Sequence, residues 1–220
     1  MLYSAEIRWF FQTTDEGIPE SRLEWFKRGY AIGDSGLAAE RARADYYLRF
    51  PQCDTVGVKL RGVPGAGKNN FEIKALFAPP RLLEHGETVR GRTDQWVKWS
   101  SDRIELPAVG DAAEWNGEQW IRVGKTRYLR KFSIDGGKPQ EVAADERPAA
   151  GCNVELTALD TDGAARFRHS LGFEAFGPPA RIHSILVETL GFFFATAGAP
   201  PAGELGIENS LSYPTWLATR

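Results

Sequence analysis

This sequence has few of the residues that usually build a metal site or a nucleophilic site. Its 220 residues include two cysteines and three histidines. Cys53 and Cys152 lack metal-ligand spacing, so we expect reduced thiols, with one disulfide as the alternative. His85, His169 and His183 are far apart in the chain. No Gly-x-Ser-x-Gly motif occurs, and the sequence therefore identifies no catalytic residue.

An excess of positive charge and a long apolar run are also lacking. Lys and Arg number 27 against 29 Asp and Glu, a formal net charge of −2, which argues against a general nucleic-acid surface but leaves room for a local basic pocket. The most apolar segment, residues 185–197, contains Glu188 and is too short to span a bilayer. No charged leader precedes an apolar stretch at the N-terminus, so we expect no signal peptide, no membrane partner and a cytoplasmic location.

Charged residues do occur at every second position of several segments, between apolar residues. The pattern holds in residues 5–9, 56–61, 71–75, 123–128 and 152–157. Successive strand side chains point to opposite faces, so the Lys, Arg and Glu of each segment share one face. If the sheet closes with that face inward, it lines a channel dense in fixed charge. We therefore predict a β-dominated α+β fold: a closed or nearly closed antiparallel β-barrel with helices packed outside.

Length and composition favour a single domain over residues 1–220, because all-β barrels often reach this length. Hydrophobic residues make up 42% of the chain, enough for a core. Helical spacing and flanking Gly or Pro predict helices over residues 19–27, 180–197 and 211–219. Residues 37–43 could add a turn or two of helix, and residues 138–151 are expected to form a flexible loop.

A glycine-rich segment, residues 62–69, comes close to a phosphate-binding P-loop. That motif needs Ser or Thr after its lysine and a helix whose N-terminus receives the phosphates. Here Asn69 follows Lys68, and a strand pattern begins at Phe71. The segment is therefore interpreted as a hairpin turn.

Paired basic residues suggest an anion site. Lys59 with Arg61, and Lys125 with Arg127, lie two apart on one strand, so each pair projects to one side. Lys74 extends the set. Phosphate suits these groups, because Arg offers a planar fork of donors and Lys a compact charge. The alternative is a solvated outer face on which Glu and Lys pair across strands.

Acidic residues share the same faces. Glu6, Glu72 and Glu155 could hold Mg²⁺ or Mn²⁺, which prefer carboxylate oxygens. They could equally serve only as salt-bridge partners of the neighbouring bases.

The order of these segments resembles the CYTH superfamily, which is named for class IV adenylate cyclase and thiamine triphosphatase. The resemblance rests on Ala5-Glu6-Ile7-Arg8-Trp9, Asp45-Tyr46-Tyr47-Leu48, Val58-Lys59-Leu60-Arg61, Phe71-Glu72-Ile73-Lys74, Gly124-Lys125-Thr126-Arg127-Tyr128, Val154-Glu155-Leu156 and Ser212-Tyr213-Pro214-Thr215-Trp216-Leu217. The family folds as a β-barrel called a triphosphate tunnel. The resemblance therefore implies binding of a triphosphate, a polyphosphate or a nucleotide-like small molecule.

The chain departs from the family at its first motif, Glu-x-Glu-x-Lys. Arg8 stands where the second Glu is expected, and Phe10 where the Lys is expected. In the region of the family's later acidic pair, the chain has Trp96-Val97-Lys98-Trp99. Family members that hydrolyse triphosphates hold divalent metal with these carboxylates. The resemblance therefore implies anion binding, in which Arg8 contacts phosphate, with metal-dependent hydrolysis weak or absent.

Three functional hypotheses follow. The first is a CYTH-like barrel that binds a polyphosphate-bearing small molecule and has weak Mg²⁺- or Mn²⁺-dependent phosphohydrolase activity. The second is a non-catalytic anion-binding module of the same fold. The third is a lipocalin-like barrel for an apolar or mixed small molecule, which requires an apolar interior and the Lys, Arg and Glu faces outside.

Overall fold

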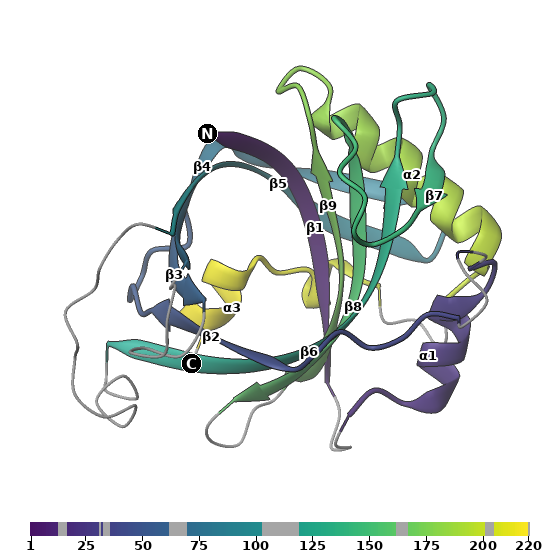
Figure 1. The fold of residues 1–220 in the computed structure, drawn as a ribbon. Coiled ribbons are helices and arrows are strands. Elements are labelled where there is room, and N and C mark those ends of the chain that lie inside the picture. Colours follow the sequence, from purple (N-terminus) through teal and green to yellow (C-terminus); the bar gives the residue numbers. More distant parts are fainter. Residues whose placement is uncertain are drawn as a thin grey trace.

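Antiparallel strands close into a barrel (Figure 1). The computed structural model describes residues 1–12, 17–30, 32, 36–61, 70–102, 119–161, 167–200 and 205–219, with the backbone alone described at residues 12, 167 and 168. Within these residues the strands are β1 (Leu2–Gln12), β2 (Arg43–Leu48), β3 (Val56–Arg61), β4 (Asn70–His85), β5 (Val89–Ser101), β6 (Trp120–Ser133), β7 (Gln140–Val142), β8 (Gly151–Thr161) and β9 (Phe167–Phe176). Their order is β2-β3-β4-β5-β1-β9-β8-β6, and β2 pairs with β6 to close the ring. The predicted closed antiparallel barrel is thus confirmed.

The register places alternate residues of each strand on opposite sides of the barrel wall. On β1, Glu6 and Arg8 line the interior cavity. Ile7 and Trp9, between and after them, are buried in the main hydrophobic core on the outer side. The charged face predicted from the sequence is therefore the inner face.

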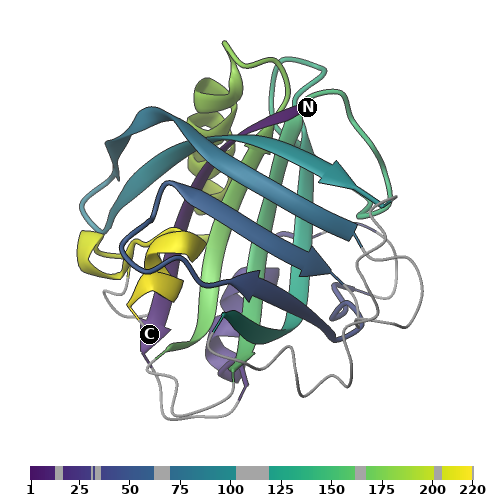
Figure 2. The same ribbon diagram turned by 90° about the vertical axis from the view of Figure 1, so that its left-hand side faces the viewer.

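Helix α2 (Ile182–Ala197) packs on the outside of β9, β1 and β8 (Figure 1), and α1 (Glu20–Lys27) packs against α2. Apolar side chains at helical spacing on α2, such as Leu186 and Phe193, join the main core with Trp9 and Phe173. The helix ends at Gly198, whose φ of 76° lies in the left-handed region that favours glycine. Figure 2 views the barrel from the side of β2–β5, with α2 on the far side.

The short helix α3 (Tyr213–Ala218) is placed differently from the prediction that helices pack outside. The Ser212 hydroxyl caps it by accepting a hydrogen bond from the N–H of Thr215 at 3.1 Å. Its Trp216 ring stacks on Phe10 at 4.7 Å, and its Tyr213 ring stacks on Tyr47 at 5.6 Å. Phe10 and Tyr47 belong to the inner face of the barrel, so α3 lies at one end of its interior.

The structure tests several predictions that the sequence made for single segments. Residues 37–42 contain no helix, and β2 begins at Arg43. The expected loop over residues 138–151 includes the short strand β7, which pairs with β6. The glycine-rich segment 62–69 lies outside the described residues. Among the described helices, none is long and apolar enough to cross a bilayer.

Candidate functional site

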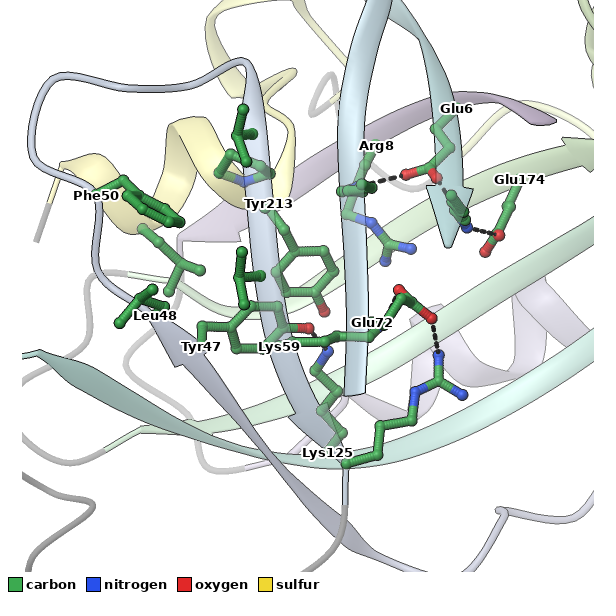
Figure 3. A pocket seen from close by; sticks show the side chains of 18 of the residues that line it. Glu6, Arg8, Tyr47, Leu48, Phe50, Lys59, Glu72, Lys125, Glu174 and Tyr213 are labelled. Atoms are coloured by element: carbon green, nitrogen blue, oxygen red, sulfur yellow. Dashed lines mark hydrogen bonds and ion pairs between the residues drawn. The ribbon is translucent and has the colours of Figure 1, made fainter. Parts of the chain in front are cut away.

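A cavity inside the barrel gathers most of the charged residues of the inner face (Figure 3). The cavity opens to solvent, and the free space within it and its mouth together is about 880 Å³. Its charged part is formed by eight basic side chains (Arg8, Arg43, Lys59, Arg61, Lys74, Lys98, Lys125 and Arg127) and four acidic ones (Glu6, Glu72, Glu155 and Glu174). All nine site residues predicted from the sequence are in this set. The alternative of a solvated outer face is therefore wrong for them.

Glu155 on β8 bridges two arginines. It accepts a hydrogen bond from Arg8 on β1 at 2.9 Å and another from Arg127 on β6. Arg127 also forms a bidentate pair with Glu40, at 2.7 and 2.9 Å, and Arg8 donates to the Ser170 hydroxyl at 3.0 Å. Burial alone would raise the pKa of Glu155, but the two guanidinium groups hold it well below its usual range.

Glu6 on β1 bridges two lysines in the same way. Its carboxylate lies 3.0 Å from the Nζ of Lys74 and 3.2 Å from that of Lys98. Lys98 also pairs with Glu174. The two lysines overcome the effect of burial and lower the pKa of Glu6, while Glu174 and Glu6 raise the pKa of Lys98 against the effect of its burial. Glu6 and Lys98 are therefore charged at neutral pH.

Glu72 on β4 pairs with both basic residues of β3. The distances are 2.7 Å to Lys59 and 3.5 Å to Arg61. Although burial opposes ionisation, Lys59 and other nearby cations lower the pKa of Glu72 to about 2. Burial lowers the pKa of Lys59 to about 8, despite the attraction of Glu72. Lys59 therefore begins to lose its proton not far above neutral pH.

Lys125 on β6 is the most enclosed of the predicted bases. It lies 3.0 Å from Asp45 on β2, donates a hydrogen bond to the Tyr47 hydroxyl, and sits 4.1 Å from the centre of the Tyr213 ring. Burial lowers its pKa to about 8, although Asp45 opposes the shift. Lys125 thus holds two aromatic side chains against the charged part of the cavity.

The predicted metal ligands are engaged with bases. Glu6, Glu72 and Glu155 each contact two Lys or Arg side chains. In the part of the chain that the structure describes, no three His, Cys, Asp or Glu side chains come together in a way that could hold a metal ion. The carboxylates as arranged do not fit a Mg²⁺ or Mn²⁺ site, since a metal would first have to displace their cationic partners.

Three of the twelve charged residues that line the cavity were not predicted from the sequence: Arg43, Lys98 and Glu174. The role of Asp45, a charged residue that contacts two of the bases, was not predicted either. Asp45 is fully buried and balances Lys125 and Arg43, at 3.0 and 3.6 Å. Lys98 is opposite Lys74 in the β4–β5 register, and Glu174 is opposite Glu6 in the β1–β9 register. Neither of these two charges stands out within its own strand, and the pairing with neighbouring strands brings them into the site.

Comparison with solved structures finds chains that are similar to this one at low sequence identity. No family model and no curated protein matches the chain. A conserved hypothetical protein from Pyrococcus furiosus is 13% identical, with 94% of each chain covered and a TM-score of 0.42. A protein from Pyrococcus horikoshii is 12% identical, with 98% of each chain covered and a TM-score of 0.43. The RNA triphosphatase Pct1 of S. pombe is 10% identical, with 89% of this chain and 79% of that chain covered and a TM-score of 0.41.

Proposed function

We propose that the barrel of this chain binds the triphosphate or polyphosphate group of a small molecule. The observation that carries the proposal is the convergence of eight basic and four acidic side chains on one cavity. The basic excess would be relieved by a multivalent anion, since clustered cations repel one another where water is scarce. Because these bases lie inside the barrel, we propose a small molecule as the partner and not a nucleic acid.

The proposed phosphate ligands are Arg8, Lys59, Arg61, Lys74, Lys125 and Arg127. Arginine forks can each take two phosphate oxygens, and the lysines supply compact charges between them. In the free protein, the carboxylates of Glu6, Glu72 and Glu155 balance these cations. In the complex, the phosphate groups would contact the same cations alongside these carboxylates. The lipocalin-like hypothesis is disfavoured, because it needs the charged faces outside.

Of the two remaining hypotheses, we favour the anion-binding module without metal-dependent catalysis. Arg8 places a cation beside Glu155 at 2.9 Å, where the resemblance leads one to expect a carboxylate. A cation there lowers the local affinity for a divalent metal. Phosphate release from tripolyphosphate with Mg²⁺ or Mn²⁺ should accordingly be weak or absent, and brisk turnover would contradict this choice.

Thermal unfolding with added anions tests the binding itself. Inorganic tripolyphosphate, with EDTA present, should raise the melting temperature by mass action, and sulfate should raise it less because it spans fewer cations. The Lys59→Met variant should weaken this shift. Arg90→Met is the matched control, because Arg90 is 54% exposed in an ion pair with Glu84 outside the cavity. Equal shifts for chloride and tripolyphosphate at matched ionic strength would refute a specific site.

A further inference from the structure

The cavity continues beyond its charged part into an apolar end. This apolar end is lined by Leu48, Phe50, Cys53, Val56, Pro214 and Leu217. The first four come from the end of β2, the following connection and the start of β3, and the last two come from α3. Figure 3 shows Leu48 and Phe50 on the far side of Tyr47 and Tyr213 from Arg8 and Glu72.

Two tyrosines form the border between the parts. The rings of Tyr47 and Tyr213 stack at 5.6 Å with an interplanar angle of 8°. On the charged side, Tyr47 accepts a hydrogen bond from Lys125, and Arg8 lies 4.9 Å from the centre of the Tyr213 ring. Their rings belong to an apolar cluster with Leu217. Such amphipathic side chains suit a boundary between charged and apolar surroundings.

The apolar end offers few hydrogen bonds from its side chains. Among the six residues that define it, the Cys53 thiol is the one polar side-chain group, and Pro214 has no backbone N–H to donate. A nucleobase or a sugar placed there would lose hydrogen bonds to water and regain few, which lowers the affinity about fivefold to 150-fold for each unpaired group. A hydrocarbon group would lose no hydrogen bonds and would gain about fourfold in affinity per buried methylene.

We infer that the ligand of this cavity is an amphiphilic phosphate ester, whose hydrocarbon group, a prenyl or alkyl chain, occupies the apolar end while its phosphates occupy the charged part. This inference rests on the proposed function and adds the chemical class of the organic group. The ligand would enter with its long axis running past Tyr47 and Tyr213.

Titration calorimetry with three diphosphates tests the inference, with EDTA present and all ligands below the concentration at which they aggregate. The probes are geranyl diphosphate, inorganic pyrophosphate and ADP, which share the diphosphate and differ in the attached group. Geranyl diphosphate should bind about tenfold or more tighter than the other two, given the methylene contribution above. Equal or tighter binding of ADP or pyrophosphate would overturn the inference and leave the proposed function standing. Absence of binding by all three, and by tripolyphosphate, would overturn the proposed function itself.

A pair of variants locates the hydrocarbon group. Phe50→Ser should reduce the affinity for geranyl diphosphate about fivefold and leave that for pyrophosphate unchanged, because it removes apolar surface from one end only. Phe192→Ser is the matched control, since Phe192 is 41% exposed on α2, outside the barrel. If Phe50→Ser fails to fold, Leu48→Ser replaces it. Loss of both affinities in equal measure, or of neither, would overturn the placement.

Discussion

Arg8 and Glu155 form an ion pair at 2.9 Å across an intervening strand. Gly172 on β9 is the residue opposite both, paired with Arg8 on one side and with Glu155 on the other. A Cβ atom at this position would lie 2.4 Å from the guanidinium carbon of Arg8. The missing side chain of Gly172 therefore provides the space through which Arg8 reaches Glu155.

The Gly172→Ala substitution should displace Arg8 without removing any charge from the cavity. We expect a lower melting temperature and an affinity for tripolyphosphate reduced about fivefold, the loss of one charge-assisted contact. Calorimetry measures the affinity. Gly136→Ala is the control, because a Cβ there meets nothing within 4 Å. Unchanged affinity in Gly172→Ala would show that the position of Arg8 does not matter for the anion.

A carboxylate at position 8 should weaken anion binding and favour the binding of a divalent metal ion. The Arg8→Glu variant would place its carboxylate near Glu155 and Glu6, so we expect weaker tripolyphosphate binding and a melting temperature that rises with Mn²⁺. Unfolding scans with and without MnCl₂ measure the response. Arg8→Gln is the neutral control and should lose anion affinity without gaining the Mn²⁺ response. A wild-type protein stabilised by Mn²⁺ as strongly as the variant would contradict the expectation.

The sequence predicted the barrel and part of its charged interior because both depend on a period of two. Pairs such as Lys59 and Arg61 show their common face within one strand, so no neighbouring strand is needed to find them. Lys98 and Glu174 are single charges among apolar residues, and only the register brings them to Lys74 and Glu6. The place of α3 was missed for a similar reason, since the helical pattern does not say that Phe10 receives Trp216 inside the barrel.

Phe10 belongs to the apolar cluster at the α3 end of the barrel. Replacing it by a charged residue should therefore destabilise the fold. Phe10 is fully buried, stacked on Trp216 and edge-on to Tyr213 at 5.6 Å. Phe10→Lys, the residue that the resemblance leads one to expect, should lower the free energy of unfolding by about 3 kcal/mol or more, because it buries a cation among aromatic rings. Phe192→Lys, at a position 41% exposed on α2, should cost less than about 1 kcal/mol. Urea unfolding of both variants measures the free energy of unfolding that each substitution removes. Equal losses of stability in the two variants would contradict the packing of α3 inside the barrel.

The affinity for polyphosphate should fall as the pH rises above 8. Burial lowers the pKa of Lys59 and that of Lys125 to about 8 in the free protein. A bound anion would raise both pKa values, so the complex holds more protons than the free protein between about pH 8 and their ordinary range near 10.4. Binding therefore takes up protons in that window, and the affinity declines by up to about tenfold per pH unit for each lysine that must be reprotonated. Calorimetry at pH 8.5, in two buffers with different ionisation enthalpies, measures the uptake. Lys59→Met should reduce it, while the ligand's own titration is common to both proteins. Equal proton uptake by Lys59→Met and wild type would mean that Lys59 stays protonated without the anion or lies away from it.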